Sequence, residues 1–490
     1  MKLFTIGDSV SQGFMSNAAA RTDLCFSTLL AKAFGLTPDS RKTDSANYFY
    51  PEWQAHGVKL NLESVFRKLE RRYGSDISTV EWATTLLTID SVINESEDYY
   101  ERGKGKEDRP YIYPGISHFH NVAIQGFSVA DAWQVTPNSC QEEIKKQAQS
   151  RGNNFLQGAN APFHRVALKV LNPTLDKSKQ SFSQLDWLGF HTENEGVENL
   201  ILWLGNNNAL STVLELDIKI TPNHPNYLVH KLSQPERWEK GWNLWHPADF
   251  EAEYSELMER VDNRMSQNKY EDWKVFIANI PMVTVIPFAK GVGETSRVLR
   301  GKDYWTYFKY YTYFPFGEAF AVKAGKHLTM QDAIFIDDCI LEYNKTIQNL
   351  VDQKNAKHGK KRYHIVDISQ RFSELAYKRN EGKPTYQFPD FFHLRYPQVN
   401  TKYYHVDKKG KLKQGGIFSL DGVHPSAITH GLIAHEFLKV MQVAGLQPER
   451  ELQWQQIFES DDLYQHPISI MQELYHKDEL ATHIIRFIER

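Results

Sequence analysis

Short runs of apolar residues recur along the chain, and several of them end at glycine or proline. Residues 3–6, 200–204, 275–280 and 363–368 have the length of buried strands, and residues 122–124 form a shorter run of the same kind. Runs without polar alternation are typical of strands that are covered on both faces of a parallel sheet. The pattern therefore predicts five buried strands that end in sharp turns.

Between these runs, apolar residues return at the three- and four-residue spacing of amphipathic helices. The spacing predicts helices over residues 26–34, 254–265, 336–350 and 428–441. Gly35 and Gly445 are expected to stop the first and last of them, and Pro425 is expected at the first helical position of the last. Strands that alternate with helices predict an α/β fold on a doubly wound parallel sheet.

The connections between the predicted elements are much longer than the usual length of about 2–6 residues. We interpret these long stretches as insertions into one domain that spans residues 1–445, with residues 446–490 as a helical C-terminal extension. The insertions cover approximately residues 40–116, 134–195, 216–248, 290–328 and 373–414. Internal repeats and low-complexity tracts are not visible in the sequence.

The composition argues against nucleic acid and a membrane as partners. Lys and Arg total 57 against 60 for Asp and Glu, and the net charge of −3 provides no field that attracts nucleic acid. No apolar run approaches the roughly 18 residues of a membrane span, so no stable membrane insertion is expected. The apolar run before Gly7 is too short for a signal peptide, which predicts a cytoplasmic protein, or a secreted one if the native precursor is longer. The three cysteines are far apart and are expected to be buried and unpaired.

A candidate nucleophile, Ser9, lies in the segment Gly7-Asp8-Ser9-Val10-Ser11, between a predicted strand and a predicted helix. This position is the carboxyl edge of a parallel sheet, where ligands bind. A serine hydroxyl near neutral pH needs an adjacent base and oxyanion donors in order to attack a carbonyl group. The alternative interpretation is that Ser9 only caps the helix that follows.

A candidate base lies near the other end of the chain, in Asp421-Gly422-Val423-His424-Pro425. Asp421 can accept the Nδ1 proton of His424 and so leave Nε2 free to take a proton from Ser9. The alternative is an Asp that caps a helix beside a surface histidine.

Two further turns after predicted strands contain candidate oxyanion donors. Asn207 lies in Gly205-Asn206-Asn207-Asn208, and Gly126 follows the run 122–124. The Asn207 amide and the backbone N–H groups of Gly126 and Ser9 are predicted to form one oxyanion hole. Taken singly, these asparagines and glycines are equally well explained as turn residues.

These four blocks, in this order, resemble those of the SGNH hydrolase family, the GDSL esterases and lipases. The resemblance implies a flavodoxin-like three-layer α/β fold and hydrolysis of carboxylic esters through a Ser9 acyl-enzyme, without a metal or organic cofactor. The expected substrate is therefore a small ester, either an acyl ester or an acetylated sugar. Val10 departs from the family's usual leucine and Asn208 from its usual Asp, whereas Asn344 echoes the family's asparagine on a late helix.

Other interpretations of the same residues remain open. The segment Gly126-Phe127-Ser128-Val129-Ala130 approximates the G-x-S-x-G motif, which makes Ser128 a second, weaker candidate nucleophile. The same triad also suits an O-acyltransferase, and the same sheet suits a binding module without turnover.

Two other groups of residues have less specific patterns. The aromatic stretch at residues 304–316 is either a lid or wall for substrate or part of the core. His118 and His120 have no carboxylate or cysteine partner at ligand spacing, so no zinc site is expected there.

Overall fold

The computed structural model describes the whole chain except residues 20, 38–46, 55–56, 58–59, 79–80, 111–115, 151–157, 225 and 490. Its centre is a parallel sheet of four strands, which lie in the order β1 (Leu3–Gly7), β4 (Asn199–Trp203), β5 (Lys274–Ala278) and β9 (Tyr363–Val366). Every residue of β1 and β4 is buried. Four of the five predicted strands are therefore confirmed.

The fifth predicted strand, residues 122–124, is not a regular strand. The segment runs beside β1, where the Val122 N–H donates to the Thr5 carbonyl (3.1 Å) and the Ile124 N–H to the Gly7 carbonyl (3.1 Å). The pairing ends there because the Gln125 N–H turns to the Gln12 side chain (3.2 Å), directly before the positive φ of Gly126. Only an isolated bridge to β1 remains of the expected strand.

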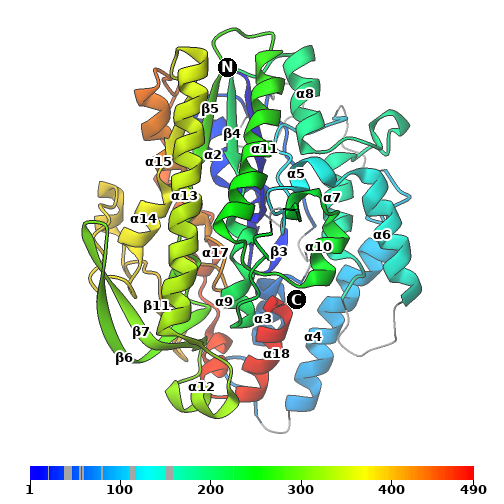
Figure 1. Ribbon diagram of the computed structural model, residues 1–490. Helices are drawn as coiled ribbons and strands as arrows, with labels where there is room; N and C mark the ends of the chain where they lie inside the picture. Colours follow the sequence, from blue (N-terminus) through cyan, green and yellow to red (C-terminus); the bar gives the residue numbers. More distant parts are fainter. Residues whose placement is uncertain are drawn as a thin grey trace.

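Helices pack on both faces of this sheet, which confirms the α/β class. In Figure 1, α8, α11 and α13 lie in front of the sheet, and α2 and α15 lie behind it. The bounds of these layers are α2 Phe26–Ala33, α8 Gln184–Asn194, α11 Pro247–Ser266, α13 Met330–His358 and α15 Ala427–Val443. The prediction that Pro425 opens the last helix is wrong by two residues, because the Ser426 side chain caps α15 by accepting from the Thr429 N–H.

Short elements connect the layers near the N-terminus and between the central strands. They are α1 (Ser9–Gln12), the hairpin β2 (Phe14–Met15) and β3 (Ala18–Ala19), α5 (Asp131–Gln134), α9 (Ser211–Glu215) and α14 (Ile368–Leu375). Residues 446–490 contain α16 (Trp454–Glu459), α17 (Asp462–Gln465) and α18 (Asp478–Glu489).

The long connections contain secondary structure of their own. Helices in them are α3 (Leu62–Tyr73), α4 (Trp82–Glu97), α6 (Pro137–Ser150), α7 (Pro162–Leu171), α10 (Gln234–Lys240) and α12 (Glu318–Ala324). Strands in them are β6 (Ala289–Arg300), β7 (Asp303–Tyr313), β8 (Leu328–Thr329), β10 (His405–Val406) and β11 (Leu412–Gln414). The antiparallel hairpin β6–β7 projects at the lower left of Figure 1.

The aromatic stretch forms β7 and packs into the core. Trp305, Tyr307 and Tyr311 are buried, and β7 packs on α13, where the Tyr307 hydroxyl donates to Asp337 Oδ2 (2.7 Å). Tyr304 alternates outward and is 55% exposed. This alternation favours the core interpretation over a lid.

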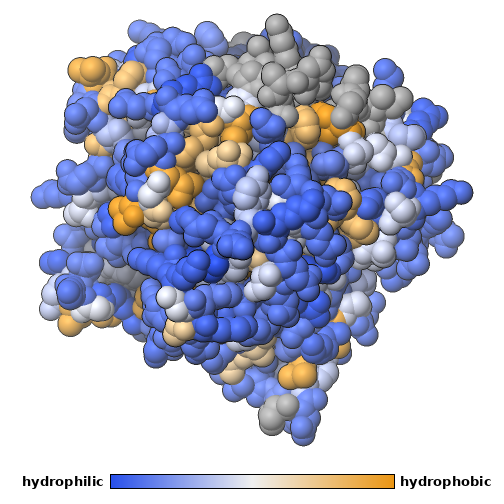
Figure 2. All heavy atoms as spheres, turned by 90° about the horizontal axis from the view of Figure 1, so that it is seen from above, coloured by the Kyte–Doolittle hydropathy of each residue, from blue (hydrophilic) through white to orange (hydrophobic). Residues whose placement is uncertain are grey.

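The hydropathy of the surface and the positions of the cysteines can be compared with the expectations from the composition. Figure 2 shows one face, on which hydrophilic residues predominate and hydrophobic residues form small separate groups. Among the described residues, no helix combines the length and apolar character that crossing a bilayer requires. Cys25, Cys140 and Cys339 are buried and unpaired, as predicted.

Candidate active site

Ser9 is held at the carboxyl end of β1 by the residues around it. Gly7 is required because a Cβ atom there would lie 2.3 Å from Ser11 Oγ and 3.0 Å from the Trp203 carbonyl oxygen. Asp8 caps α1, since its Oδ1 accepts from the Val10 N–H (3.1 Å). The interpretation of Ser9 as the helix cap is therefore wrong, because Asp8 has that role. Ser9 is the first residue of α1, and its own N–H belongs to the unpaired first turn.

The structure brings Ser9, His424 and Asp421 into one hydrogen-bonded chain. The Ser9 hydroxyl lies 3.0 Å from His424 Nε2, and His424 Nδ1 lies 2.9 Å from Asp421 Oδ2. With Asp421 ionised, Nδ1 carries the proton and Nε2 is the acceptor for the Ser9 hydroxyl. The ring of His424 also packs on Phe14, with 4.6 Å between the ring centroids.

Asp421 is fully buried but held in its ionised form. Its Oδ1 accepts from the N–H groups of Val423 and His424, each at 2.8 Å, and its Oδ2 also accepts from the Asn17 N–H at 2.8 Å. Burial by itself would raise the pKa of Asp421, but the adjacent His424 and these hydrogen bonds outweigh it and hold the pKa below its usual value. Asp421 does not cap α15, so that alternative is wrong as well.

The hairpin β2–β3 links the two ends of this chain of groups. Its turn residues Ser16 and Asn17 both have positive φ, which places their N–H groups toward the loop that contains Asp421. Besides the Asn17 bond to Asp421, the Ser16 N–H donates to Ser419 Oγ (2.8 Å) and the Leu420 N–H to Ser16 Oγ (3.3 Å). The segment directly after Ser9 therefore positions the acidic member of the group.

The predicted oxyanion donors line the same open pocket as Ser9 and His424. Gly126 has a φ of +76° and Asn207 Nδ2 donates one of its protons to the Phe127 carbonyl (2.9 Å). A primary amide has a second N–H for a ligand. The far wall of the pocket is formed by Trp238, Trp242, Trp245 and Ile488. A second, narrow cavity touches Ser9 and His424 and is lined mainly by apolar side chains, among them Trp203, Met282, Val283, Ile286 and Phe372.

The unusual Asn208 is explained by a buried glutamate that the sequence did not reveal. Asn208 Nδ2 donates to Glu253 Oε2 (3.0 Å), while Asn208 Oδ1 accepts from the Val129 N–H (3.3 Å). Glu253 Oε1 in turn accepts from the Ala130 N–H (2.6 Å), and burial raises the pKa of Glu253 to about 7. A carboxylate at position 208 would lie against a second carboxylate. The amide therefore suits this turn, and the pair holds the segment that follows Gly126.

Exchanging these two groups gives a testable prediction. Asn208→Asp is expected to lower the free energy of unfolding at pH 8 by about 2–4 kcal/mol, because it places two carboxylates together in the interior. The double variant Asn208→Asp with Glu253→Gln restores one amide and one carboxylate and is expected to recover most of this loss. Urea unfolding of the three proteins measures both effects. A single variant as stable as the parent, or a double variant no better than the single one, would contradict this account.

Asp8 joins the ends of β1 and β4 in the same buried region. Its Oδ2 accepts from Asn206 Nδ2 (2.8 Å), and no water reaches the carboxyl group, because the residue is completely buried. Burial raises the pKa of Asp8 to about 6, although the bonds from Asn206 and the Val10 N–H oppose that shift.

The raised pKa of Asp8 predicts a pH dependence of stability. Between pH 3.8, where the free side chain ionises, and about 6, the folded protein holds a proton that the unfolded chain has released, so stability falls as pH rises. Asp8→Asn lacks this pH-dependent loss of stability. Relative to the parent, its free energy of unfolding is expected to rise by up to about 3 kcal/mol as the pH increases from 3.5 to 7. Asp407→Asn is the control, since the pKa of Asp407 is lowered to about 2 and its removal has the opposite sign. Equal pH profiles for the parent and Asp8→Asn would refute the prediction.

Ser128 lies in the same pocket, but no imidazole within the described part of the chain is hydrogen-bonded to its hydroxyl. Its hydroxyl donates to Asp131 Oδ2 (2.9 Å), and Asp131 is paired with Arg237 (2.5 Å). Burial raises the pKa of Asp131, but the ion pair with Arg237 and the bond from the Ser128 N–H (2.7 Å) already occupy this carboxylate. Asn344 on α13 fixes the end of β5 through the N–H and carbonyl of Ile280, both at 2.8 Å.

His118 and His120 have no carboxylate partner at ligand spacing in the sequence, but the fold brings one to His120. Glu195 is 75 positions away in the sequence from His120, yet its Oε1 lies 3.1 Å from His120 Nε2. Spacing along the chain could not indicate this contact, because it depends on the packing of α8 against β1.

The sequence matches no model of a known protein family, and no curated protein matches it. The functional argument therefore rests on the motifs and on the geometry of the site.

Proposed function

We propose that this protein is a serine hydrolase that cleaves carboxylic esters, with the flavodoxin-like three-layer fold of the SGNH family. The single observation that carries the proposal is the hydrogen-bonded chain from Ser9 through His424 to Asp421 at the carboxyl edge of the sheet. The strand order supports the fold: if the segment 121–124 is counted beside β1, the order in chain sequence is 2-1-3-4-5, which is the flavodoxin-like order.

In the proposed reaction, Ser9 Oγ attacks the carbonyl carbon of the ester while its proton passes to His424 Nε2. The negative charge that develops on the carbonyl oxygen is stabilised by the Ser9 and Gly126 N–H groups and by Asn207 Nδ2. As the tetrahedral intermediate collapses, the C–O bond to the alcohol breaks and His424 gives its proton to the leaving oxygen. The product of this half-reaction is an acyl ester of Ser9.

Water then replaces the alcohol in the second half-reaction. His424 takes a proton from the water as it attacks the acyl carbon, and returns that proton to Ser9 Oγ when the acid leaves. Asp421 stays ionised throughout and holds the imidazolium. Each step is completed by residues of this chain, and neither a metal ion nor an organic cofactor takes part in the proposal.

The two spaces on either side of Ser9 suit the two halves of an ester. The narrow cavity with apolar walls suits an apolar group, and the open pocket with three tryptophans and the polar side chains of Gln125 and Glu215 suits a larger amphipathic group. Both fit a small-molecule ester, either an acyl ester or an acetylated sugar.

Labelling with a fluorophosphonate tests this function directly. We expect one modified residue per chain, mapped to Ser9 by mass spectrometry, and no modification of His424→Ala. A protein that stays unlabelled at every serine would support the binding module instead. Product analysis with added alcohols separates the hydrolase from the O-acyltransferase, because a transferase forms a new ester in preference to the free acid.

A further inference from the structure

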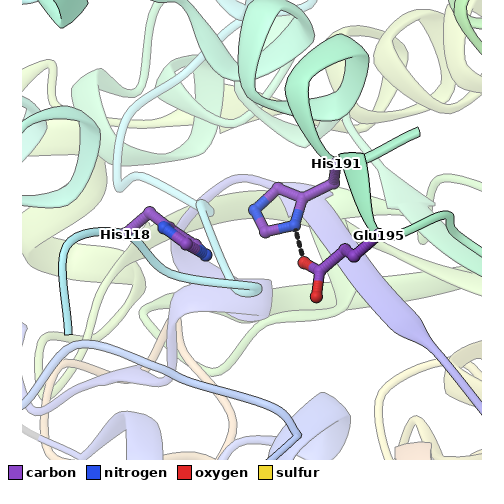
Figure 3. A group of neighbouring side chains, drawn as sticks. All are labelled: His118, His191 and Glu195. Atoms are coloured by element: carbon purple, nitrogen blue, oxygen red, sulfur yellow. Dashed lines mark hydrogen bonds and ion pairs between the residues drawn. The ribbon is translucent and has the colours of Figure 1, made fainter. Parts of the chain in front are cut away.

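A second group of reactive side chains lies near the start of β1, away from Ser9. His191 is on α8 and Glu195 is its C-cap residue, while His118 comes from the segment beside β1. One ligand atom of each of these three residues lies within 4.8 Å of the other two. Figure 3 shows the imidazole of His191 between His118 and Glu195.

The hydrogen bonds of this group give each residue a distinct role. The Phe49 N–H donates to His120 Nδ1 (2.9 Å), so neutral His120 has its proton on Nε2 and donates it to Glu195 Oε1. His120 therefore holds the carboxylate in place. His191 Nδ1 is also bonded to Glu195 Oε1, but its Nε2 is buried without a hydrogen-bond partner among the described residues.

An orphaned ring nitrogen in the interior is costly for a residue that is 1% exposed. It also means that His191 can give Nε2 to a metal ion without breaking a hydrogen bond, whereas Nδ1 would first have to leave Glu195 Oε1. His118 is half-buried, and its only hydrogen bond within the described residues is to the adjacent Ser117 Oγ (3.0 Å). Its imidazole can therefore turn toward the other two residues at little cost.

We propose that His118, His191 and Glu195 form a zinc site, with His120 as the positioning residue for the carboxylate. Two imidazole nitrogens and one carboxylate oxygen are a common zinc ligand set, which leaves a fourth position for water. Zinc bonds of about 2.0–2.2 Å require ligand atoms closer together than 4.8 Å, so the ion draws His118 inward. Lys2 Nζ, 3.4 Å from Glu195 Oε2, is the cation with which zinc competes for the carboxylate.

Zinc bound at this site would stabilise the fold and would take no part in the reaction at Ser9. Zinc would link α8 to the segment that begins near His118, runs beside β1 and ends at Gly126. The catalytic steps proposed above contain no metal. Removal of zinc is therefore expected to loosen this link without abolishing labelling of Ser9.

Zinc titration of the metal-stripped full-length protein tests the site. We expect one zinc ion per chain with micromolar affinity or better, in competition with a chromophoric chelator, and a rise in Tm on zinc addition. His118→Ala and the near-isosteric Glu195→Gln are each expected to weaken binding at least about 100-fold. His393→Ala removes an exposed histidine elsewhere and is expected to bind zinc like the parent.

The outcomes separate this site from the hydrolase. Fluorophosphonate labelling of Ser9 in the His118 and Glu195 variants reports on the fold and on the catalytic group independently of zinc. A parent protein that binds no zinc at micromolar concentration, or a His118→Ala variant that binds it equally well, would overturn the metal site and leave the proposed hydrolase untouched.

Discussion

Ser9→Ala is expected to lower the kcat for ester hydrolysis by at least about 10⁴-fold, because among the described residues no other hydroxyl is hydrogen-bonded to the imidazole of His424. The fold should be unchanged, since the Ser9 side chain has one hydrogen bond and little volume. Hydrolysis of p-nitrophenyl esters of increasing chain length measures the loss, and thermal unfolding checks the structure.

Ser128→Ala is the matched control, because it removes a hydroxyl from the same pocket. It is expected to keep turnover within about tenfold of the parent, since its partner Asp131 is already engaged by Arg237. If Ser128→Ala abolishes turnover while Ser9→Ala retains it, the assignment of the nucleophile is reversed.

Asp421→Asn is expected to lower kcat by about 10⁴-fold with the site still in place. An amide at this position points an N–H at His424 Nδ1, which favours the tautomer with its proton on Nε2 and removes the acceptor for Ser9. The Asn17 N–H also loses its acceptor, so a fall in the free energy of unfolding of about 1–3 kcal/mol should accompany the loss of rate.

Ser419→Ala separates these two effects. Ser419 Oγ donates to Asp421 Oδ1 (3.2 Å) and accepts from the Ser16 N–H, whereas the bond of Ser419 to the His424 carbonyl (2.8 Å) comes from its backbone N–H and is kept in the variant. We expect a comparable loss of stability with kcat reduced less than about tenfold. Full activity of Asp421→Asn in a stably folded protein would show that the imidazole needs no carboxylate partner.

The sequence was sufficient for the elements whose signal is local. The strands β1, β4, β5 and β9 are apolar runs of about five residues. The start of α13 is indicated by the capping box of Thr329 and Asp332. The edge position of Ser9 followed from the rule that ligands bind at the carboxyl ends of parallel strands, whereas its pairing with His424 was expected from the resemblance of the four blocks to the SGNH family.

Features that depend on tertiary packing were not predictable in this way. Periodicity gave no sign that Glu253 is buried beside Asn208, or that Glu195 meets His120, because each pairing joins segments distant in the chain. The Asp8 side chain was expected only as a neighbour of the nucleophile, yet it caps α1. The hairpin β6–β7 lies mostly in a stretch that was interpreted as an insertion and for which no strand was predicted, since β-propensity depends strongly on what the strand packs against.

The hydrogen bonds between the β2–β3 hairpin and the loop at residues 419–424 determine when the site can form during folding. Ser9 precedes its base by 415 positions in the chain. Contacts of such high sequence separation form late in folding. A chain that ends before residue 419 would thus contain the proposed nucleophile without the base that activates it, and the proposed hydrolytic activity would require residues 419–424 to be folded against the hairpin.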